Sequence, residues 1–330
     1  MKVHILDDWY DSLRGLPSFG LLAGHEVTIW TDRAADDEVL ARRLSDADAV
    51  VLFRDRTAVT ASLAARLQGG PRLIAMRGQH GHVNADALTR AGILFCARKA
   101  RDGASRSTAE LTMGLVIAGL RYLPDQIASA RAGHWQGAAP LGRNVAGQRL
   151  GLYGYGGIAK LVAGFARAMG MEVRFWASDQ GRDRAAADGE DLPATRRDFF
   201  AQSDVVSIHK RLTPDTRAEI TQGDLMAMRP GSLLINTSRA GLIAEGAVLQ
   251  ALEAGRIERA ALDVFPQEPV TDPADPLLSH PGVIPTPHIG FITREELDRQ
   301  FGQIYDLVNA HARGEPFDMV NPAVWTRDRN

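Results

Sequence analysis

A glycine-rich turn near the middle of the chain, within the segment LGLYGYGGIAKLVAGFARAMGMEVRFW, limits the folds that this sequence can adopt. The apolar residues of 150–153 predict a buried strand, and apolar residues recur with helical spacing over 158–169. Gly154, Gly156 and Ala159 form the pattern G-x-G-x-x-A where the strand meets the helix. A second strand, MEVRFW, follows, so the segment predicts a strand–turn–helix–strand unit.

The residues of this turn suit a phosphate ligand. Gly154 permits a tight turn, and Gly156 lets a pyrophosphate approach the backbone closely. Ala159 keeps the helix close to the strand, while free N–H groups at the start of the helix attract phosphates. The pattern is weak evidence by itself but strong evidence in this structural context. It therefore predicts a dinucleotide-binding site, with the candidate residues Gly154, Tyr155, Gly156, Gly157 and Ile158.

Segments typical of strands alternate with segments of helical spacing along almost the whole chain. The strands expected in a first series are MKVHIL, HEVTIW, AVVLF, RLIAM and GILFCA, and those in a second are QRLGLYGYG, MEVRFW, DVVSIH, SLLINTS, AALDVF and VIPTPH. Strands that alternate with helices form parallel sheets covered on both faces. Two such series predict two α/β units, and 330 residues is long for a single core.

Two predicted helices stand where the chain would cross between these units. In SRSTAEL, Ser107 and Glu110 have the spacing of a capping box before an apolar run. In FITREEL, Thr293 and Glu296 repeat that spacing after the last predicted strand. The simpler interpretation is two well-capped helices and nothing more. The interpretation that we favour is that the second unit is inserted into the first.

Composition excludes several classes of protein. The formal net charge of −2 argues against a nucleic-acid or membrane surface as the main partner. The single cysteine, Cys96, excludes an internal disulfide and a cysteine-rich zinc site, and no metal ligand set is expected. The first residues, MKVHILDDWYD, do not resemble a signal peptide, and the apolar stretch 111–120 is too short to span a bilayer. We expect a cytoplasmic protein.

The end of the second strand of the dinucleotide-binding unit bears on the choice of cofactor. An acidic residue there usually binds the ribose hydroxyls, and the expected position falls near Ala177. Asp179 could reach the ribose if the strand runs two residues longer, which favours NAD. Ser178 with Arg182 or Arg184 could instead accept a 2′-phosphate, which favours NADP. No arginine directly follows the strand, so we expect NAD, with NADP as the alternative.

Three later segments follow predicted strands, where the sites of α/β proteins collect. They are INTSRAG, which contains Arg239, ALDVFPQEP, which contains Asp263 and Glu268, and TPHIG, which contains His288. Pro287 disfavours a helix before His288 and Gly290 frees the backbone after it, so this histidine is expected on a shaped loop. Each charged residue could be only a solvated side chain. Together, a guanidinium could bind a carboxylate or ketone, and a carboxylate could orient a proton-exchanging histidine.

With these motifs identified, the sequence resembles the D-isomer-specific 2-hydroxyacid dehydrogenases, including the branch that is similar to D-3-phosphoglycerate dehydrogenase. The motifs LGLYGYGGIA, SDVVSIH, LLINTSRAG, AALDVFPQEP and TPHIG occur in the order and spacing of that family. The resemblance implies a Rossmann domain, residues 103–292, inserted into a flavodoxin-like substrate domain formed by residues 1–102 and 293–330. It also implies a homodimer built through the cofactor domains, and interconversion of a 2-keto acid and a D-2-hydroxy acid with a nicotinamide cofactor.

By matching position, the resemblance implies that Arg239 binds substrate, that His288 is the acid and base with Glu268 as its partner, and that Asp263 lies near the nicotinamide. It further assigns cofactor contacts to Ser178, Asp179, His209, Thr237 and Gly290. The loop RGQHGHVNAD is similar to the loop of the family that binds the substrate carboxylate, and its candidates are Arg77, Gly78, Gln79, His80 and Gly81.

The chain departs from the family pattern at a few positions. Ala159 and Ala240 replace frequent glycines, and His82 with His80 makes the substrate loop rich in imidazole. Arg211 stands where proline is common and adds positive charge beside the expected cofactor cleft. Two other functions use a similar chain: a dehydrogenase of another small anion, such as formate or phosphite, and a nucleotide-sensing binding protein like the C-terminal binding protein corepressors. The absence of a long disordered tail lowers the expectation for the second.

Overall fold

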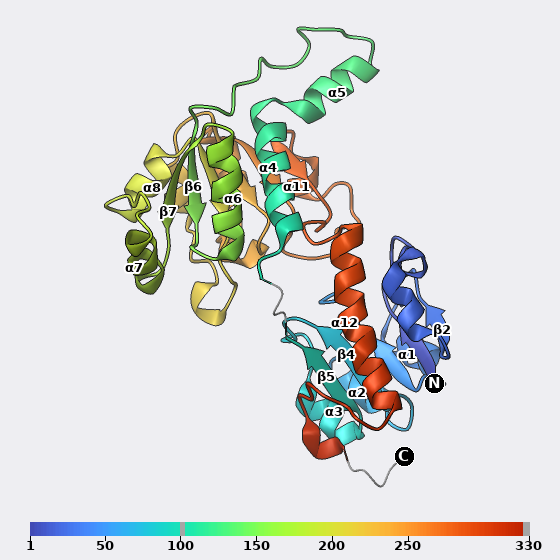
Figure 1. Cartoon of the computed structure of the whole chain (residues 1–330). Coiled ribbons are helices and arrows are strands. Elements are labelled where there is room, and N and C mark those ends of the chain that lie inside the picture. Colours follow the sequence, from blue (N-terminus) through green and yellow to red (C-terminus); the bar gives the residue numbers. More distant parts are fainter. Residues whose placement is uncertain (100–102, 326–330) are drawn as a thin grey trace. The chain divides into compact units, whose positions relative to one another are not determined.

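The structure, a computed structural model, describes residues 1–99 and 103–325 (Figure 1). The chain forms two compact units. The first contains Met1–Gly103 and Thr293–Asn330, and the second contains Ala104–Ile292. The second unit is therefore an insertion between two segments of the first. Residue 102, at which we expected the first boundary, lies outside the described residues.

The first unit is built on a five-stranded parallel sheet in the order β2-β1-β3-β4-β5. This is the strand order of flavodoxin-like folds. The strands are β1 Lys2–Ile5, β2 Glu26–Ile29, β3 Ala49–Val51, β4 Leu73–Arg77 and β5 Leu94–Arg98. The α-helices of this unit are α1 Asp37–Arg43, α2 Ala61–Arg66, α3 Ala85–Ala91 and α12 Arg294–Ala312. Because α12 packs against β4 and β5, the C-terminal segment completes the unit that the N-terminal segment begins.

The second unit is built on a six-stranded parallel sheet in the order β11-β10-β9-β8-β6-β7. Its strands are β6 Arg149–Tyr153, β7 Glu172–Trp176, β8 Val205–Ile208, β9 Ser232–Asn236, β10 Ile257–Leu262 and β11 Val283–Pro285. Its α-helices are α4 Arg106–Leu120, α5 Leu123–Arg131, α6 Gly157–Ala168, α7 Asp179–Ala187, α8 Arg196–Gln202, α9 Gln222–Met226, α10 Ala247–Glu253 and α11 Pro276–Ser279. The strand order reverses at β6, beside which both β7 and β8 lie.

Two apolar clusters cover the two faces of this sheet. Leu150 and Leu152 of β6 pack in one cluster with residues of α4 and α6, whereas Tyr153 packs in the other with residues of α8 and α10. In β9, Leu234 packs in the second cluster, whereas Leu233 and Ile235 pack in the first. Because successive side chains of a strand point to opposite faces, these near-continuous apolar strands require helices on both sides. The doubly wound α/β fold expected from the sequence is confirmed.

Each of the eleven segments expected as strands contains or overlaps one of the eleven strands found among the described residues. One helix start was wrong. Helix α4 begins at Arg106, and its cap is Ser105, whose Oγ accepts a hydrogen bond from Thr108 N at 3.4 Å. Ser107 is buried in the first turn, and Glu110 instead pairs with Arg106 at 3.0 Å. Thr293 does cap α12, accepting from the backbone N–H of Glu296 at 3.2 Å. Within the described residues, no helix has the length and apolar character needed to cross a membrane.

Candidate active site

All six strands of the second unit end at the same level. The register pairs Trp176 with Tyr153, Tyr153 with Ile208, Ile208 with Asn236, and Asn236 and Pro285 with Leu262. The chain after each of these residues therefore leaves the sheet at one edge. Every candidate site residue of this unit follows one of these strand ends within a few positions. The parallel sheet thus brings together at one edge residues that lie more than a hundred positions apart in the sequence.

The glycine turn after β6 has the geometry that a phosphate ligand requires. Gly154 has φ +123°, and a Cβ at this position would lie 2.3 Å from the carbonyl oxygen of His209, so only glycine fits. At Gly156, which caps α6, a Cβ would meet no described atom within 4 Å, so the backbone is open to a ligand. The side chain of Tyr155 is turned away to Asp188, with 2.5 Å between the hydroxyl and the carboxylate. Tyr155 can therefore contact a cofactor through its backbone but not through its side chain.

The strand β7 ends at Trp176, which corrects the sequence-based argument for NAD. Asp179 was expected to reach the ribose if the strand ran two residues longer, but Ser178 already caps helix α7 and Asp179 is its first residue. Arg182, one of the two arginines considered for a 2′-phosphate, stacks 4.2 Å above the Trp176 ring and donates to the Pro193 carbonyl. Asp179 therefore belongs to a helix and not to a longer strand, and the side chain of Arg182 is held by Trp176 and Pro193.

The loops after β10 and β11 bring His288 and Glu268 into direct contact. Their Nδ1 and Oε2 atoms are 2.6 Å apart, and the other oxygen of Glu268 accepts a hydrogen bond from Phe265 N at 2.9 Å. The Phe291 ring lies edge-on to the imidazole, 5.5 Å away. His288 has φ +54°, so the left-handed residue of this loop is the histidine itself and not Gly290. With Nδ1 held by the carboxylate, Nε2 is the ring nitrogen left for proton exchange.

Asp263 holds the backbone on which His288 sits. This carboxylate is fully buried and accepts three hydrogen bonds, from Thr286 Oγ1 at 2.6 Å, Ile289 N at 2.8 Å and Gly290 N at 2.8 Å. Burial raises the pKa of Asp263, and these three hydrogen bonds oppose the rise. Because the bonded groups flank His288 on both sides, they compensate for its left-handed conformation.

Replacing Asp263 with asparagine is expected to lower the free energy of unfolding by about 1–3 kcal/mol. Asparagine has a single acceptor oxygen, so at least one of the buried N–H groups of Ile289 and Gly290 would lose its partner. Urea unfolding followed by circular dichroism measures the change. Thr286→Val is the matched control, because it removes one donor but leaves both backbone groups bonded, and it should cost less. An Asp263→Asn protein as stable as wild type would contradict this account of the loop.

Arg239 lies in the loop after β9 and is half-buried. Asn236 shapes this loop, donating to the Arg239 carbonyl at 3.0 Å and accepting from Ser238 N at 3.0 Å. Arg239 Nη1 donates to the Ser238 carbonyl at 2.8 Å, and Ser238 Oγ donates to the Lys210 carbonyl at 2.6 Å. The loops after β8 and β9 are therefore fastened together. Thr237 is buried, and its hydroxyl lies 2.9 Å from that of Thr112.

His209 follows β8 and supports the glycine turn. Its backbone N–H donates to the Tyr153 carbonyl at 2.8 Å, and its Nε2 lies 2.8 Å from Ser207 Oγ. Burial lowers the pKa of His209 to about 4, so the ring is neutral near neutral pH. His209 therefore supports the turn through its hydrogen bonds and adds no positive charge beside it.

The candidate substrate loop lies in the first unit, after β4. Arg77 is buried, and its Nε donates to Gln303 of α12 at 2.7 Å. Gly78 has φ +96°, and Gln79 and Gly81 are exposed. The ring of His80 packs edge-on against Phe95 at 5.4 Å. Of the five candidates, the backbone glycines and Gln79 are thus the accessible ones, whereas Arg77 and His80 are engaged within the unit.

Sequence analysis missed the hydroxyl groups of α4. Thr108 and Thr112 are buried, and Thr108 Oγ1 donates to the Gly290 carbonyl at 2.9 Å while Thr112 Oγ1 contacts Thr237. One helix thus supports both the His288 loop and the loop after β9. The detectable signal was a pair of threonines four residues apart on a helix whose later residues are apolar. Among the described residues, no group of three or more His, Cys, Asp or Glu could hold a metal ion.

Comparison with known protein families identifies the family of this chain. The family model of the D-isomer specific 2-hydroxyacid dehydrogenase, NAD binding domain, matches residues 113–290, more than half of the chain. The chain belongs to this family. The match includes the glycine turn, Arg239, Glu268 and His288.

Several members of the D-2-hydroxyacid dehydrogenase family are similar over most of this chain. D-3-phosphoglycerate dehydrogenase of Methanocaldococcus jannaschii is 34% identical over 84% of the chain and 52% of its own length. Hydroxypyruvate reductase of Thermotoga maritima is 32% identical over 83% of the chain and 88% of its own length. The crystal structure of phosphoglycerate oxidoreductase from Vibrio cholerae is 36% identical, with a TM-score of 0.89 over 95% of this chain and 99% of that one. The chain spans about half the length of the D-3-phosphoglycerate dehydrogenases that it matches.

Proposed function

We propose that the protein transfers a hydride between a nicotinamide cofactor and a 2-keto acid, giving a D-2-hydroxy acid, and that it also catalyses the reverse reaction. The observation that carries this proposal is the His288–Glu268 contact of 2.6 Å, at the same edge of the sheet as the glycine turn. A histidine held by a carboxylate supplies the proton that accompanies hydride transfer. The names of similar proteins, including D-3-phosphoglycerate dehydrogenase and hydroxypyruvate reductase, support the same substrate class.

Each candidate residue has a distinct role in this proposal. Arg239 binds the substrate carboxylate and carbonyl through its planar fork of N–H groups. His288 donates a proton to the carbonyl oxygen as negative charge develops there, and accepts one in the reverse direction. Glu268 orients the ring through its contact with Nδ1. For the loop of residues 77–81 in the first unit, we propose carboxylate binding through the backbone, a role supported by the exposed residues Gln79 and Gly81.

The cofactor that we propose is NAD, with NADP also accepted, and it supplies the hydride when bound. The backbone from Gly154 to Ile158 binds the pyrophosphate, as the open space above Gly156 supports. In this proposal Ser178 and Asp179, at the start of α7, contact the adenosine ribose, and His209 with Thr237 lines the sheet edge. Asp263 and Gly290 are assigned to the nicotinamide side. The family description names an NAD binding domain, which supports a nicotinamide cofactor.

A turnover assay tests the proposed reaction. The purified protein is given NADH or NADPH with a panel of 2-keto acids, and glyoxylate, hydroxypyruvate, 3-phosphohydroxypyruvate and 4-methyl-2-oxopentanoate represent small, polar, phosphorylated and apolar members. We expect oxidation of the cofactor with at least one of them, and a D-configured product by chiral chromatography. Turnover only with formate or phosphite in the oxidative direction would replace the substrate class. Cofactor binding without turnover of any acid would favour a nucleotide-sensing protein.

We also propose that the protein is a homodimer formed through the second unit. Helix α5 has no buried residue, and it and the chain that follows stand apart from the rest of the unit (Figure 1). We call residues 123–142 the α5 arm. Its apolar side chains are unusually exposed, with Trp135 at 89%, Leu141 at 95% and Ile127 at 49%. Large apolar groups on one extended segment mark a surface that another protein covers, and a second copy of this chain is the occupant that we propose.

Replacing both Trp135 and Leu141 with serine is expected to raise the dimer dissociation constant by about a hundredfold or more, because each buried side chain contributes about 1.5–3 kcal/mol. Sedimentation equilibrium measures this constant. Met169→Ser is the matched control, since Met169 is another exposed apolar residue of the second unit, 37% exposed, outside the α5 arm. A monomeric wild-type protein, or a double variant that dimerises normally, would show that the arm has another role.

A further inference from the structure

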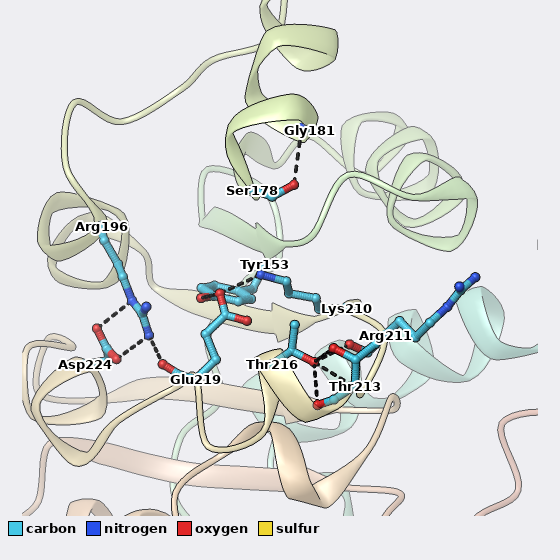
Figure 2. A network of polar contacts seen from close by, with 10 residues as sticks. All are labelled: Tyr153, Ser178, Gly181, Arg196, Lys210, Arg211, Thr213, Thr216, Glu219 and Asp224. Atoms are coloured by element: carbon cyan, nitrogen blue, oxygen red, sulfur yellow. Dashed lines mark hydrogen bonds and ion pairs between the residues drawn. The ribbon is translucent and has the colours of Figure 1, made fainter. Parts of the chain in front are cut away.

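Arg211 is a positive charge that the proposed reaction does not use. It lies three residues after the end of β8 and is exposed, and its carbonyl accepts a hydrogen bond from Thr216 Oγ1 at 2.8 Å. This bond fixes its backbone in the turn that leads to Thr216. Among the residues that the structure describes, no ion pair or side-chain hydrogen bond engages its guanidinium. Figure 2 shows the side chain extended away from the neighbouring polar network.

The adjacent cation, Lys210, is in a different situation. Its Nζ lies 2.5 Å from Glu219, which also accepts a hydrogen bond from the Tyr153 hydroxyl at 2.9 Å. Arg196 donates to the Glu219 carbonyl and pairs with Asp224 at 2.6 Å, so the segment that carries Glu219 is held as well (Figure 2). The charge of Lys210 is therefore neutralised inside the protein. Of the two consecutive cations after β8, only Arg211 presents its charge outward.

The neighbouring strand end carries no acid at the usual position. In NAD-binding Rossmann units, a carboxylate at the end of the second strand binds the ribose 2′-hydroxyl, and it repels a 2′-phosphate. Here Ala177 follows β7 and is 8% exposed, and the next residue is Ser178, whose hydroxyl caps α7. Because β7 and β8 both pair with β6, their ends lie roughly 10 Å apart, twice the usual strand spacing. An extended arginine side chain can span most of that distance.

We propose that Arg211 binds the 2′-phosphate of NADP(H), together with the hydroxyl of Ser178, so that the site accepts both nicotinamide cofactors. This inference rests on the proposed dinucleotide function. A guanidinium and a phosphate form short, charge-assisted hydrogen bonds, and NADH, which lacks the 2′-phosphate, cannot make them. Asp179, the first residue of α7, carries the opposing charge. Its repulsion keeps NADP(H) from being the sole cofactor.

Equilibrium binding tests this assignment without turnover. Quenching of tryptophan fluorescence gives dissociation constants for NADPH and NADH, and calorimetry gives those for adenosine 2′,5′-bisphosphate and 5′-AMP. In Arg211→Gln, we expect the constants for NADPH and for the bisphosphate to rise about tenfold or more. Those for NADH and 5′-AMP should stay unchanged, which also shows that the variant is folded. Asp179→Asn should tighten NADPH binding. Arg184→Gln is the matched control, because Arg184 is an exposed arginine on α7.

The outcomes separate this inference from the function on which it depends. If NADH binds to the wild-type protein but NADPH does not, Arg211 is not a phosphate ligand and the proposed function stands. The inference is also wrong if Arg211→Gln weakens both cofactors equally, or if Arg184→Gln produces the selective loss. If neither dinucleotide binds, the proposed function and this inference fail together.

Discussion

His288→Ala is expected to abolish turnover in both directions, while Glu268→Gln keeps part of the activity. Reduction of a keto acid needs a proton donor at the carbonyl oxygen, and oxidation needs a proton acceptor at the hydroxyl group. The Glu268 carboxylate, 2.6 Å from Nδ1, holds the ring of His288 with a charged hydrogen-bond acceptor. Glutamine keeps the shape and a hydrogen bond but removes the charge, so the ring is held less firmly in the variant.

We expect kcat/KM of Glu268→Gln to fall in both directions, but by less than the roughly 100- to 10,000-fold that a positioned general acid or base contributes. Steady-state kinetics in both directions measures the loss, and an isotope effect with deuterated cofactor shows whether hydride transfer limits the rate.

Glu253→Gln provides the matched control, because Glu253 is an exposed glutamate of α10 away from the sheet edge, and its replacement should leave kcat/KM unchanged. If Glu268→Gln also leaves kcat/KM unchanged while chemistry limits the rate, the His288–Glu268 contact is structural. An active His288→Ala protein would exclude His288 as the acid and base.

Arg239→Lys is expected to lose about 30- to 1,000-fold in kcat/KM for the keto acid, although the variant keeps the positive charge. An ammonium group cannot reproduce the two parallel hydrogen bonds of a guanidinium to a carboxylate and carbonyl. Losing hydrogen bonds that strengthen in the transition state costs roughly 2–4 kcal/mol, which corresponds to that range. The two hydrogen bonds of Asn236 that shape the loop go to the Arg239 carbonyl and the Ser238 N–H, which are backbone groups, so they survive the substitution.

Steady-state kinetics with the best acid of the panel measures this loss. The control is Arg229→Lys, because Arg229 of the same unit makes an exposed ion pair with Asp204 at 2.7 Å, and its replacement should leave kcat/KM unchanged. A value for Arg239→Lys within about threefold of wild type would mean that Arg239 does not bind the reacting end of the substrate.

The sequence by itself determined the positions of the strands, the glycine turn and the candidate chemical groups. These depend on local rules. Strand periodicity, the steric need for glycine at Gly154 and the position of polar residues after apolar runs are all written within a few consecutive residues. For this reason His288, Glu268 and Arg239 could be named before their contacts were known.

Local rules did not place the start of α4. Ser107 and Glu110 have the spacing of a capping box, but the residue that caps the helix is Ser105. Ser107 is buried while Ser105 caps α4, so packing of the first turn made the choice. The end of β7 at Trp176 is a similar case, because Ser178 closes the strand by starting α7 and so moves Asp179 onto a helix.

The tertiary structure alone decided the geometry of the candidate site. The level ends of the six strands arise from pairing between segments far apart in sequence, such as Leu262 with Asn236. The left-handed backbone of His288 is held by Asp263, which lies 25 positions earlier and accepts the N–H groups of Ile289 and Gly290. No local pattern specifies such a conformation for a histidine. The left-handed conformation persists because the buried carboxylate of Asp263 needs these two donors. The free energy of forming the two hydrogen bonds exceeds the cost of the strained backbone.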